Sequence, residues 1–245
     1  MSVINLNKHQ AIVIQGPMQY YPVHVAEFYS QFDNIIWSTW DDENPNTISQ
    51  VKETGINVIL NKKPKLNGIL NINYQFHSTF AGIEYFKENN PNITEVMKIR
   101  SDVIFFGVER ALQRVNGSDI SFMFMYNKHT EVHKPVYYLD YWHYGMDFPA
   151  DYIVHGSIDA MHNTFNFQME YMADIPPEAI VLRNYLKYRG LENNFDFDYL
   201  KKVGIVFFGK WAKNDDYYTL SLKNGLDLFK DTHLIGYTDP NLFLK

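Results

Sequence analysis

Three charged residues at alternate positions could together bind an anionic ligand. They are Lys98, Arg100 and Asp102, within residues 95–102. On a β-strand, residues i, i+2 and i+4 lie on one face, so these side chains would project side by side. Two cations and a carboxylate suit a nucleotide diphosphate with a divalent metal. The same residues are equally compatible with an edge strand whose solvated face carries a Lys/Arg–Asp ion pair.

A second candidate is Gln15-Gly16-Pro17, where the apolar run at residues 11–16 ends. Ligands of open α/β sheets bind outside the carboxyl ends of the strands. A glycine there lets a ligand approach the backbone, and Gln15 could hydrogen-bond a base or a ribose. The motif contains no GxGxxG, which disfavours a dinucleotide fold. The alternative is an ordinary turn between a strand and a loop.

Amide side chains at Asn71, Asn73 and Gln75 surround the start of a predicted long helix. Amides in this position could contact a nucleotide or donate to a phosphate group. The alternative is that Asn71 caps the helix and that the other two are solvated.

Candidate general bases lie in the second half of the chain. The carboxylates there are Asp140, Asp147, Asp151, Asp159, Glu170 and Glu178. Asp151, in a predicted strand before His155-Gly156, and Glu178, at a predicted helix start, are best placed to take a proton from a hydroxyl group. Each could instead be a surface acid or a helix cap.

The order of the predicted elements is that of a doubly wound sheet. Strands are expected at residues 11–16, 34–39, 56–60, 95–101, 119–126, 151–154 and 203–208. Helices are expected at residues 22–32, 48–54, 72–89, 108–115, 158–165 and 176–188. An aromatic-rich loop at residues 137–149 could form the wall of a sugar-binding groove. The C-terminal half is less regular, and residues 211–245 match no clear pattern.

The composition narrows the class of protein. The chain has 245 residues, a net charge of −6 and no cysteine. A thiol nucleophile, a disulfide and a cysteine-based zinc site are thereby excluded, and a general nucleic-acid binder is disfavoured. The first residues are too polar for a signal peptide, and no apolar run reaches the roughly 18 residues of a membrane span. A cytoplasmic protein without a transmembrane segment is expected.

Several of these motifs, taken in order, resemble the WavE-type lipopolysaccharide-synthesis family of GT-A-like glycosyltransferases. The matching segments are Ile12–Pro17, Asn71–Gln75, Met97–Asp102, Asp151–Ser157 and Pro177-Glu178, so the resemblance covers roughly residues 10–190. Tyr74 stands where the family pattern has an arginine. GT-A enzymes usually carry an Asp-x-Asp metal signature, whereas this chain has one acid in Arg100-Ser101-Asp102.

The resemblance implies a single GT-A-like, Rossmann-like α/β domain over residues 1–245. Its mostly parallel central sheet would be flanked by helices. Residues 1–126 would bind the nucleotide sugar, and residues 127–245, with their irregular structure, would bind the acceptor.

The implied activity is transfer of a sugar from a nucleotide-diphosphate sugar, such as a UDP-sugar, to a glycan acceptor. The acceptor would be a lipopolysaccharide-like or other surface polysaccharide, or a glycoprotein. The motifs at residues 15–17 and 71–75 would hold the nucleoside. Lys98, Arg100 and Asp102 would hold the diphosphate, Asp102 through Mn²⁺ or Mg²⁺, unless the two cations make the metal dispensable. Asp151 or Glu178 would be the general base.

Two other functions are compatible with the sequence. A sugar nucleotidyltransferase would usually show a glycine-rich basic loop after the first strand, and Gly16-Pro17-Met18-Gln19-Tyr20 contains no basic residue. A non-catalytic glycan-binding protein would keep the aromatic wall and would not respond to a nucleotide.

Overall fold

The fold is described from a computed structural model. It covers residues 8–68, 71–105, 108–115, 119–124, 136–138, 141–143, 149–167, 177–191, 205–209 and 219–221.

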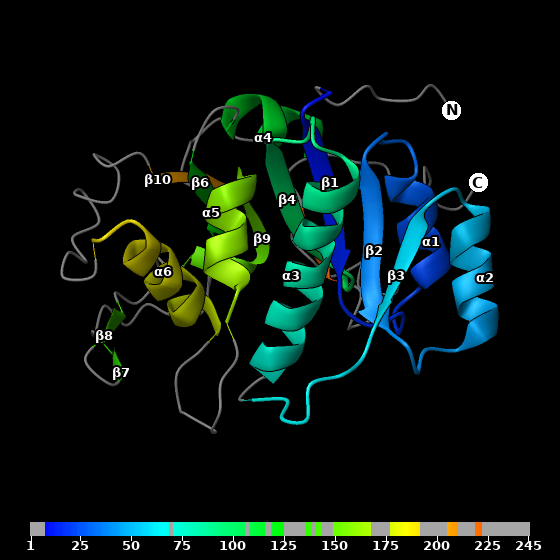
Figure 1. The fold of residues 1–245 in the computed structure, drawn as a ribbon, viewed down its shortest axis with the longest axis horizontal. Helices are drawn as coiled ribbons and strands as arrows, with labels where there is room; N and C mark the ends of the chain where they lie inside the picture. Colours follow the sequence, from blue (N-terminus) through cyan, green and yellow to red (C-terminus); the bar gives the residue numbers. More distant parts are fainter. Residues whose placement is uncertain are drawn as a thin grey trace.

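The described chain is built around a seven-stranded sheet (Figure 1). Its strands, in spatial order, are β10 (Ile205–Gly209), β6 (Ile120–Phe124), β9 (Pro149–Ser157), β4 (Glu95–Arg100), β1 (Gln10–Gln15), β2 (Ile35–Trp40) and β3 (Asn57–Asn61). All strands of this sheet run in the same direction except β9, which is antiparallel to both β4 and β6. The continuous apolar runs of β1 and β2 are buried along their whole length, as expected of strands covered on both faces. The predicted α/β fold with a mostly parallel sheet is confirmed.

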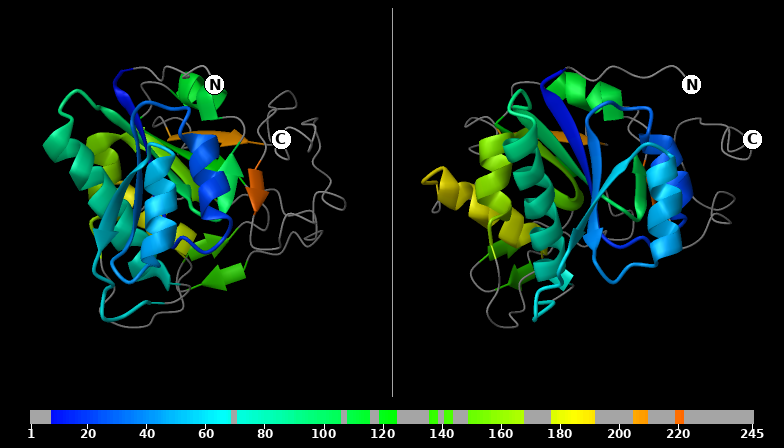
Figure 2. Two further views of the ribbon diagram at one scale, coloured as in Figure 1. Left: turned by 90° about the vertical axis from the view of Figure 1, so that its right-hand side faces the viewer. Right: turned by 45° about the vertical axis from the view of Figure 1, so that its right-hand side comes forward.

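Helices cover both faces of the sheet (Figure 2). One core contains residues of α1 (Pro22–Tyr29), α2 (Pro45–Glu53) and α4 (Val108–Val115). The core on the other face contains residues of α3 (Ile72–Asn89), α5 (Ile158–Phe165) and α6 (Pro177–Tyr188). Among the described residues, no helix is both long and apolar enough to cross a membrane.

Side-chain caps fix the start of two helices. The Asn44 side chain accepts hydrogen bonds from the backbone of Asn46 and Thr47, and Pro45 occupies the first turn. The helix expected at residues 48–54 therefore begins earlier, at Pro45. Ser157 accepts a hydrogen bond from the backbone N–H of Ala160 and so caps α5, the helix expected at residues 158–165.

The strand that carries the charged motif lies in the middle of the sheet. β4 pairs with β1 on one side and with β9 on the other. Lys98 is only 1% exposed, so the interpretation of this stretch as a solvated edge strand is wrong. The central position of β4 could not be predicted from the local sequence. Its second neighbour, β9, comes from a segment more than 50 residues downstream.

Four short strands were not predicted. β5 (Val103–Phe105) pairs with β11 (Thr219–Ser221), and β7 (Val136–Tyr138) pairs with β8 (Tyr141–His143), both antiparallel. The aromatic-rich segment at 137–149 is thus partly strand, in keeping with the β-propensity of aromatic and β-branched residues. Its side chains lie outside the described residues, so the aromatic acceptor wall stays a prediction.

Candidate functional site

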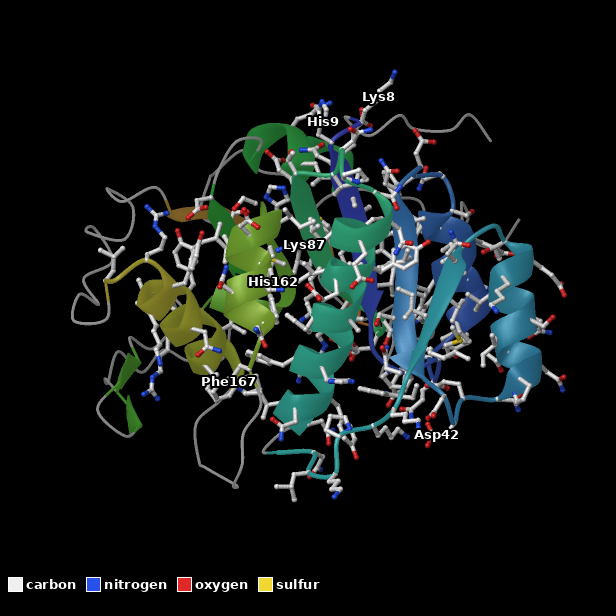
Figure 3. All side chains as sticks on the ribbon, in the orientation of Figure 1. Lys8, His9, Asp42, Lys87, His162 and Phe167 are labelled. Atoms are coloured by element: carbon white, nitrogen blue, oxygen red, sulfur yellow. The ribbon has the colours of Figure 1, made fainter. Side chains whose placement is uncertain are left out.

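A cavity of about 690 Å³ opens at the carboxyl edge of the parallel strands. From β3 the chain returns to β4 on the other side of β1, so the strand order reverses between β1 and β4. Ligands of open α/β sheets bind at such a switch point. The cavity is lined by the ends of β1, β2 and β4, by the start of α3 and by Pro177 at the start of α6. Figure 3 places Asp42, a lining residue, at this edge, and Lys8 and His9 at the opposite edge.

The turn after β1 is held tightly against the end of β4. Gly16 has a φ of 121°, a conformation that favours glycine. The backbone N–H of Ser101 donates to Gln15 O at 2.8 Å, and the Ser101 hydroxyl donates to Pro17 O at 2.9 Å. Trp37 Nε1 also donates to Gly16 O at 3.0 Å. The predicted segment at residues 15–17 therefore forms one wall of the cavity with a fixed backbone.

Gln15 carries a buried oxygen without a partner. The side chain is 4% exposed and lines the cavity. Among the described residues, its Oε1 atom has no hydrogen-bond partner. A buried acceptor left in this state costs about 1–3 kcal/mol. The arrangement suits a ligand that brings a donor group to this point.

Arg100 and Asp102 form a bidentate ion pair in the cavity wall. Arg100 Nε donates to Asp102 Oδ1 at 2.9 Å, and Nη2 donates to Oδ2 at 2.7 Å. The two side chains are 16% and 7% exposed, respectively. Arg100 pairs in register with Gln15 and Lys98 with Val13, so Gln15, Lys98 and Arg100 lie on the same face of the sheet. Lys98 is buried deeper and is not among the lining residues.

The start of α3 contributes two of its three predicted residues to the cavity. Asn71 and Gln75 line it. Asn71 has a left-handed backbone, makes no capping hydrogen bond, and accepts a hydrogen bond from Asn67 instead. Asn73 is buried and donates to Leu66 O at 3.0 Å, so it holds the preceding turn.

The aromatic residues that line the cavity were not predicted to be site residues. Trp40, at the end of β2, lies with its ring centroid 5.2 Å from that of Tyr74, and both line the cavity together with Tyr20. The ring of His77 lies nearly parallel to Trp40, at 6.3 Å, and partial burial lowers the pKa of His77. The position of Trp40 at the end of a predicted parallel strand could have marked it as a site residue.

Charged residues on the loops after β2 and β3 complete the rim. Lys63 and Asp42 form an ion pair at 2.6 Å. Glu43 Oε1 accepts hydrogen bonds from the backbone of Met18 at 3.1 Å and from Thr39 Oγ1 at 2.9 Å. Glu43 thus connects the loop after β2 to the turn after β1.

Both predicted general bases lie on backbone near this edge. Glu178 directly follows Pro177, a lining residue. Asp151 lies two residues before Ile153, which pairs with Ile99 near the end of β4. The register between β6 and β9 shifts at residues 151–153, as happens at β-bulges, which are common beside active sites. The side chains of both acids lie outside the described residues, so their roles stay predictions.

No family model and no curated protein sequence matches this chain. Solved structures do resemble its fold. One is a protein from Bacillus anthracis assigned as a glucose-1-phosphate thymidylyltransferase, in complex with sucrose. It has a TM-score of 0.54 and 11% sequence identity, and the match covers 94% of this chain and 98% of that chain.

Another similar structure is a 4-diphosphocytidyl-2C-methyl-D-erythritol synthase from Anaerococcus prevotii. It has a TM-score of 0.48 and 9% identity, over 88% of this chain and 93% of that chain. At 11% identity, the similarity to the structure from Bacillus anthracis supports the Rossmann-like α/β fold and nothing more specific.

Proposed function

We propose that this chain is a transferase that holds a nucleotide sugar in the cavity at the carboxyl edge of the sheet. The observation that carries the proposal is the buried Oε1 of Gln15, which has no hydrogen-bond partner in the described part of the chain. It lies on the same sheet face as Arg100, and both residues line the same cavity. Gln15 would accept from the base or the ribose, and Arg100 would bind the diphosphate. The volume of about 690 Å³ suits a ligand of this size.

The main candidate reaction is glycosyl transfer to a glycan acceptor, such as a surface polysaccharide or a glycoprotein. The bond between the anomeric carbon and the diphosphate oxygen breaks, and the nucleoside diphosphate leaves with the electron pair. The acceptor oxygen bonds to the anomeric carbon, and its proton passes to a carboxylate. Asp151 and Glu178 are the candidates for this base.

The turn after β1 favours glycosyl transfer over nucleotidyl transfer. Residues 16–21 contain no lysine or arginine. A triphosphate would require more cations than a diphosphate, and among the described residues that line the cavity only Lys63 and Arg100 carry a positive charge.

A sugar nucleotidyltransferase is the second candidate, and the likeness in fold to the thymidylyltransferase favours it. In this reaction a sugar-phosphate oxygen attacks the α-phosphorus of a nucleoside triphosphate. Pyrophosphate leaves, and the nucleotide sugar is the product. The same cavity would then hold a product in place of a donor.

One pair of assays separates these reactions. The full chain is incubated with UDP-, GDP-, dTDP- or CMP-sugars and a panel of glycan acceptors, and in parallel with nucleoside triphosphates and sugar 1-phosphates. We expect nucleotide release that depends on the acceptor. Pyrophosphate release in the second assay would assign the chain to the second candidate. Inactivity in both, without nucleotide binding, would leave a glycan-binding protein.

Arg100→Met and Lys87→Met form a matched pair for these assays. Both remove a cation that is ion-paired with an aspartate, but Lys87 lies on α3 and pairs with Asp159, outside the cavity lining. We expect only Arg100→Met to reduce turnover.

A further inference from the structure

We propose that the diphosphate subsite works without a divalent metal, with Arg100 as its cation and Asp102 as the residue that positions Arg100. This inference rests on the proposed nucleotide-sugar function and concerns how the site neutralises the diphosphate.

The ligand set of Asp102 does not suit a metal ion. Each carboxylate oxygen accepts a hydrogen bond from Arg100, at 2.9 and 2.7 Å. A cation bound to Asp102 would have to displace the guanidinium or share its oxygens with it, at close range and in a wall where the carboxylate is only 7% exposed. Like charges held this close repel each other strongly at low dielectric.

The other carboxylates that line the cavity, as far as the structure describes them, do not complete a metal site. Asp42 pairs with Lys63, and Glu43 Oε1 accepts from the backbone of Met18 and from Thr39. Within the described ranges, no group of three or more His, Cys, Asp or Glu residues could hold a metal ion. A Mg²⁺ or Mn²⁺ site built on the described side chains would therefore rest on Asp102 alone, and each of its two oxygens already accepts a hydrogen bond from Arg100.

Arg100 has the properties of a diphosphate ligand. Its guanidinium is planar, keeps its charge at all relevant pH values, and presents N–H donors in a fork that matches phosphate oxygens. Asp102 fixes the plane of this fork through two hydrogen bonds. Lys98 adds a second basic side chain two residues earlier on the same face of β4. This arrangement places a pre-oriented cation next to Gln15, where the proposed nucleoside would end.

Binding measurements on the full chain test the assignment. Calorimetric titrations with UDP, GDP and TDP are made once with EDTA and once with Mn²⁺. We expect the same affinity in both. We expect Arg100→Met and Arg100→Lys to weaken binding by about tenfold to a hundredfold, because a charge-assisted fork is lost. Lys87→Met, the matched control, should bind as the wild type does.

A double-mutant cycle separates positioning from a direct or structural role of Asp102. Asp102→Asn should weaken binding equally with EDTA and with Mn²⁺. In the Arg100→Met background, Asp102→Asn should cause no further loss of nucleotide affinity, because Asp102 acts through Arg100. A further loss of the same size in that background would overturn the positioning role.

The outcomes distinguish this inference from the proposed function. Nucleotide binding by the wild-type chain that requires Mn²⁺ would overturn the inference and keep the function. No binding of any nucleotide diphosphate under either condition would overturn both. The comparison between EDTA and Mn²⁺ uses the wild-type chain, so it gives an answer even if a variant fails to fold.

Discussion

At the scale of single residues, Gly16 is the position where the site and the backbone depend most closely on each other. A Cβ at Gly16 would lie 2.7 Å from Ser101 Oγ, and φ at this position is 121°. We expect Gly16→Ala to lower the free energy of unfolding by about 2–4 kcal/mol, because the backbone is strained and the bond from Ser101 to Pro17 is disturbed.

Gly55→Ala is the control for Gly16→Ala. Gly55 has a φ of 95°, but nothing lies within 4 Å of an added Cβ. Gly55→Ala should lower the free energy of unfolding only by the conformational cost, about 1–2 kcal/mol, and should leave nucleotide binding unchanged. Equal effects of the two variants in denaturant unfolding and in nucleotide titration would contradict the proposed role of the turn.

Gln15 should show opposite effects on stability and binding. Gln15→Met removes a buried acceptor that has no described partner, so the free energy of unfolding should rise by about 1 kcal/mol. Nucleotide affinity should fall by about tenfold or more because a hydrogen bond to the ligand is lost.

Thr79→Val is the matched control for Gln15→Met. Its hydroxyl is also buried and without a partner among the described residues, and it does not line the cavity. This variant should be as stable as the wild type or more so, with unchanged affinity. A loss of affinity in Thr79→Val, or none in Gln15→Met, would remove Gln15 from the site.

Several site residues could be predicted, because the period of two in a strand assigns side chains to faces. Lys98 and Arg100 share a face as expected, and Asp102 follows at the same edge. The alternation of side chains along a strand does not show how deeply each position is buried. The same role was therefore predicted for Lys98 and for Arg100. Trp40 and Tyr74 were missed because aromatic residues in an α/β chain usually fill the core.

At the scale of elements, the close approach of α3 to the sheet supports the base of the site. A Cβ on Gly82 would lie 2.5 Å from Val13 Cγ1, in β1, and 3.4 Å from Ile36, in β2. We expect Gly82→Ala to lower the free energy of unfolding by about 1–3 kcal/mol through overpacking, although alanine is the better helix former.

Glu88→Ala, at an exposed position of the same helix, is the control for Gly82→Ala. It should change the free energy of unfolding by less than about 0.5 kcal/mol in chemical denaturation. A stabilised Gly82→Ala variant would show that α3 can move away from β1 at little cost.

The elements themselves could be predicted to different degrees. Long periodic segments such as α3, and capped segments such as α5, match the expected ranges, because the relevant interactions are local. The pairs β5–β11 and β7–β8, and the antiparallel direction of β9, depend on contacts between strands. The positions of these partners are set by tertiary packing, which a local pattern does not contain.

At the scale of the whole molecule, the sheet joins the two halves that were expected to bind donor and acceptor. β9 and β10 come from residues 127–245 and lie in the same sheet as β1–β4. Asp119, before β6, accepts hydrogen bonds from Ser157 at 3.0 Å, from Tyr185 of α6 at 2.8 Å, and from Arg189. Burial raises the pKa of Tyr185, and the neighbouring Asp119 raises it further.

Removing Asp119 should loosen this connection. We expect Asp119→Ala to lower the free energy of unfolding by about 2–3 kcal/mol, since the buried Tyr185 hydroxyl and the partly buried Ser157 hydroxyl lose a charged acceptor. Asp159→Ala, which removes a mostly exposed ion pair with Lys87, should cost less than about 1 kcal/mol. Thermal or denaturant unfolding measures both, and similar losses would contradict the assigned role of Asp119.

The α/β architecture could be predicted because alternating strand and helix patterns are strong in the first half of the chain. The fold supports more than one transferase chemistry, so the function is argued from the cavity. Within it, Gln15, Arg100 and Asp102 are the residues on which the proposal depends.

Thermal unfolding with and without nucleotide diphosphates tests the central claim most directly. UDP, GDP or TDP at about 100 times its Kd should raise the Tm of the full chain by about 5–10 °C. The same concentration should shift Gln15→Met and Arg100→Met by about half as much or less, and should shift Thr79→Val and Lys87→Met as it does the wild type. No shift with any nucleotide, or an equal shift in all four variants, would contradict a nucleotide site at the carboxyl edge of this sheet.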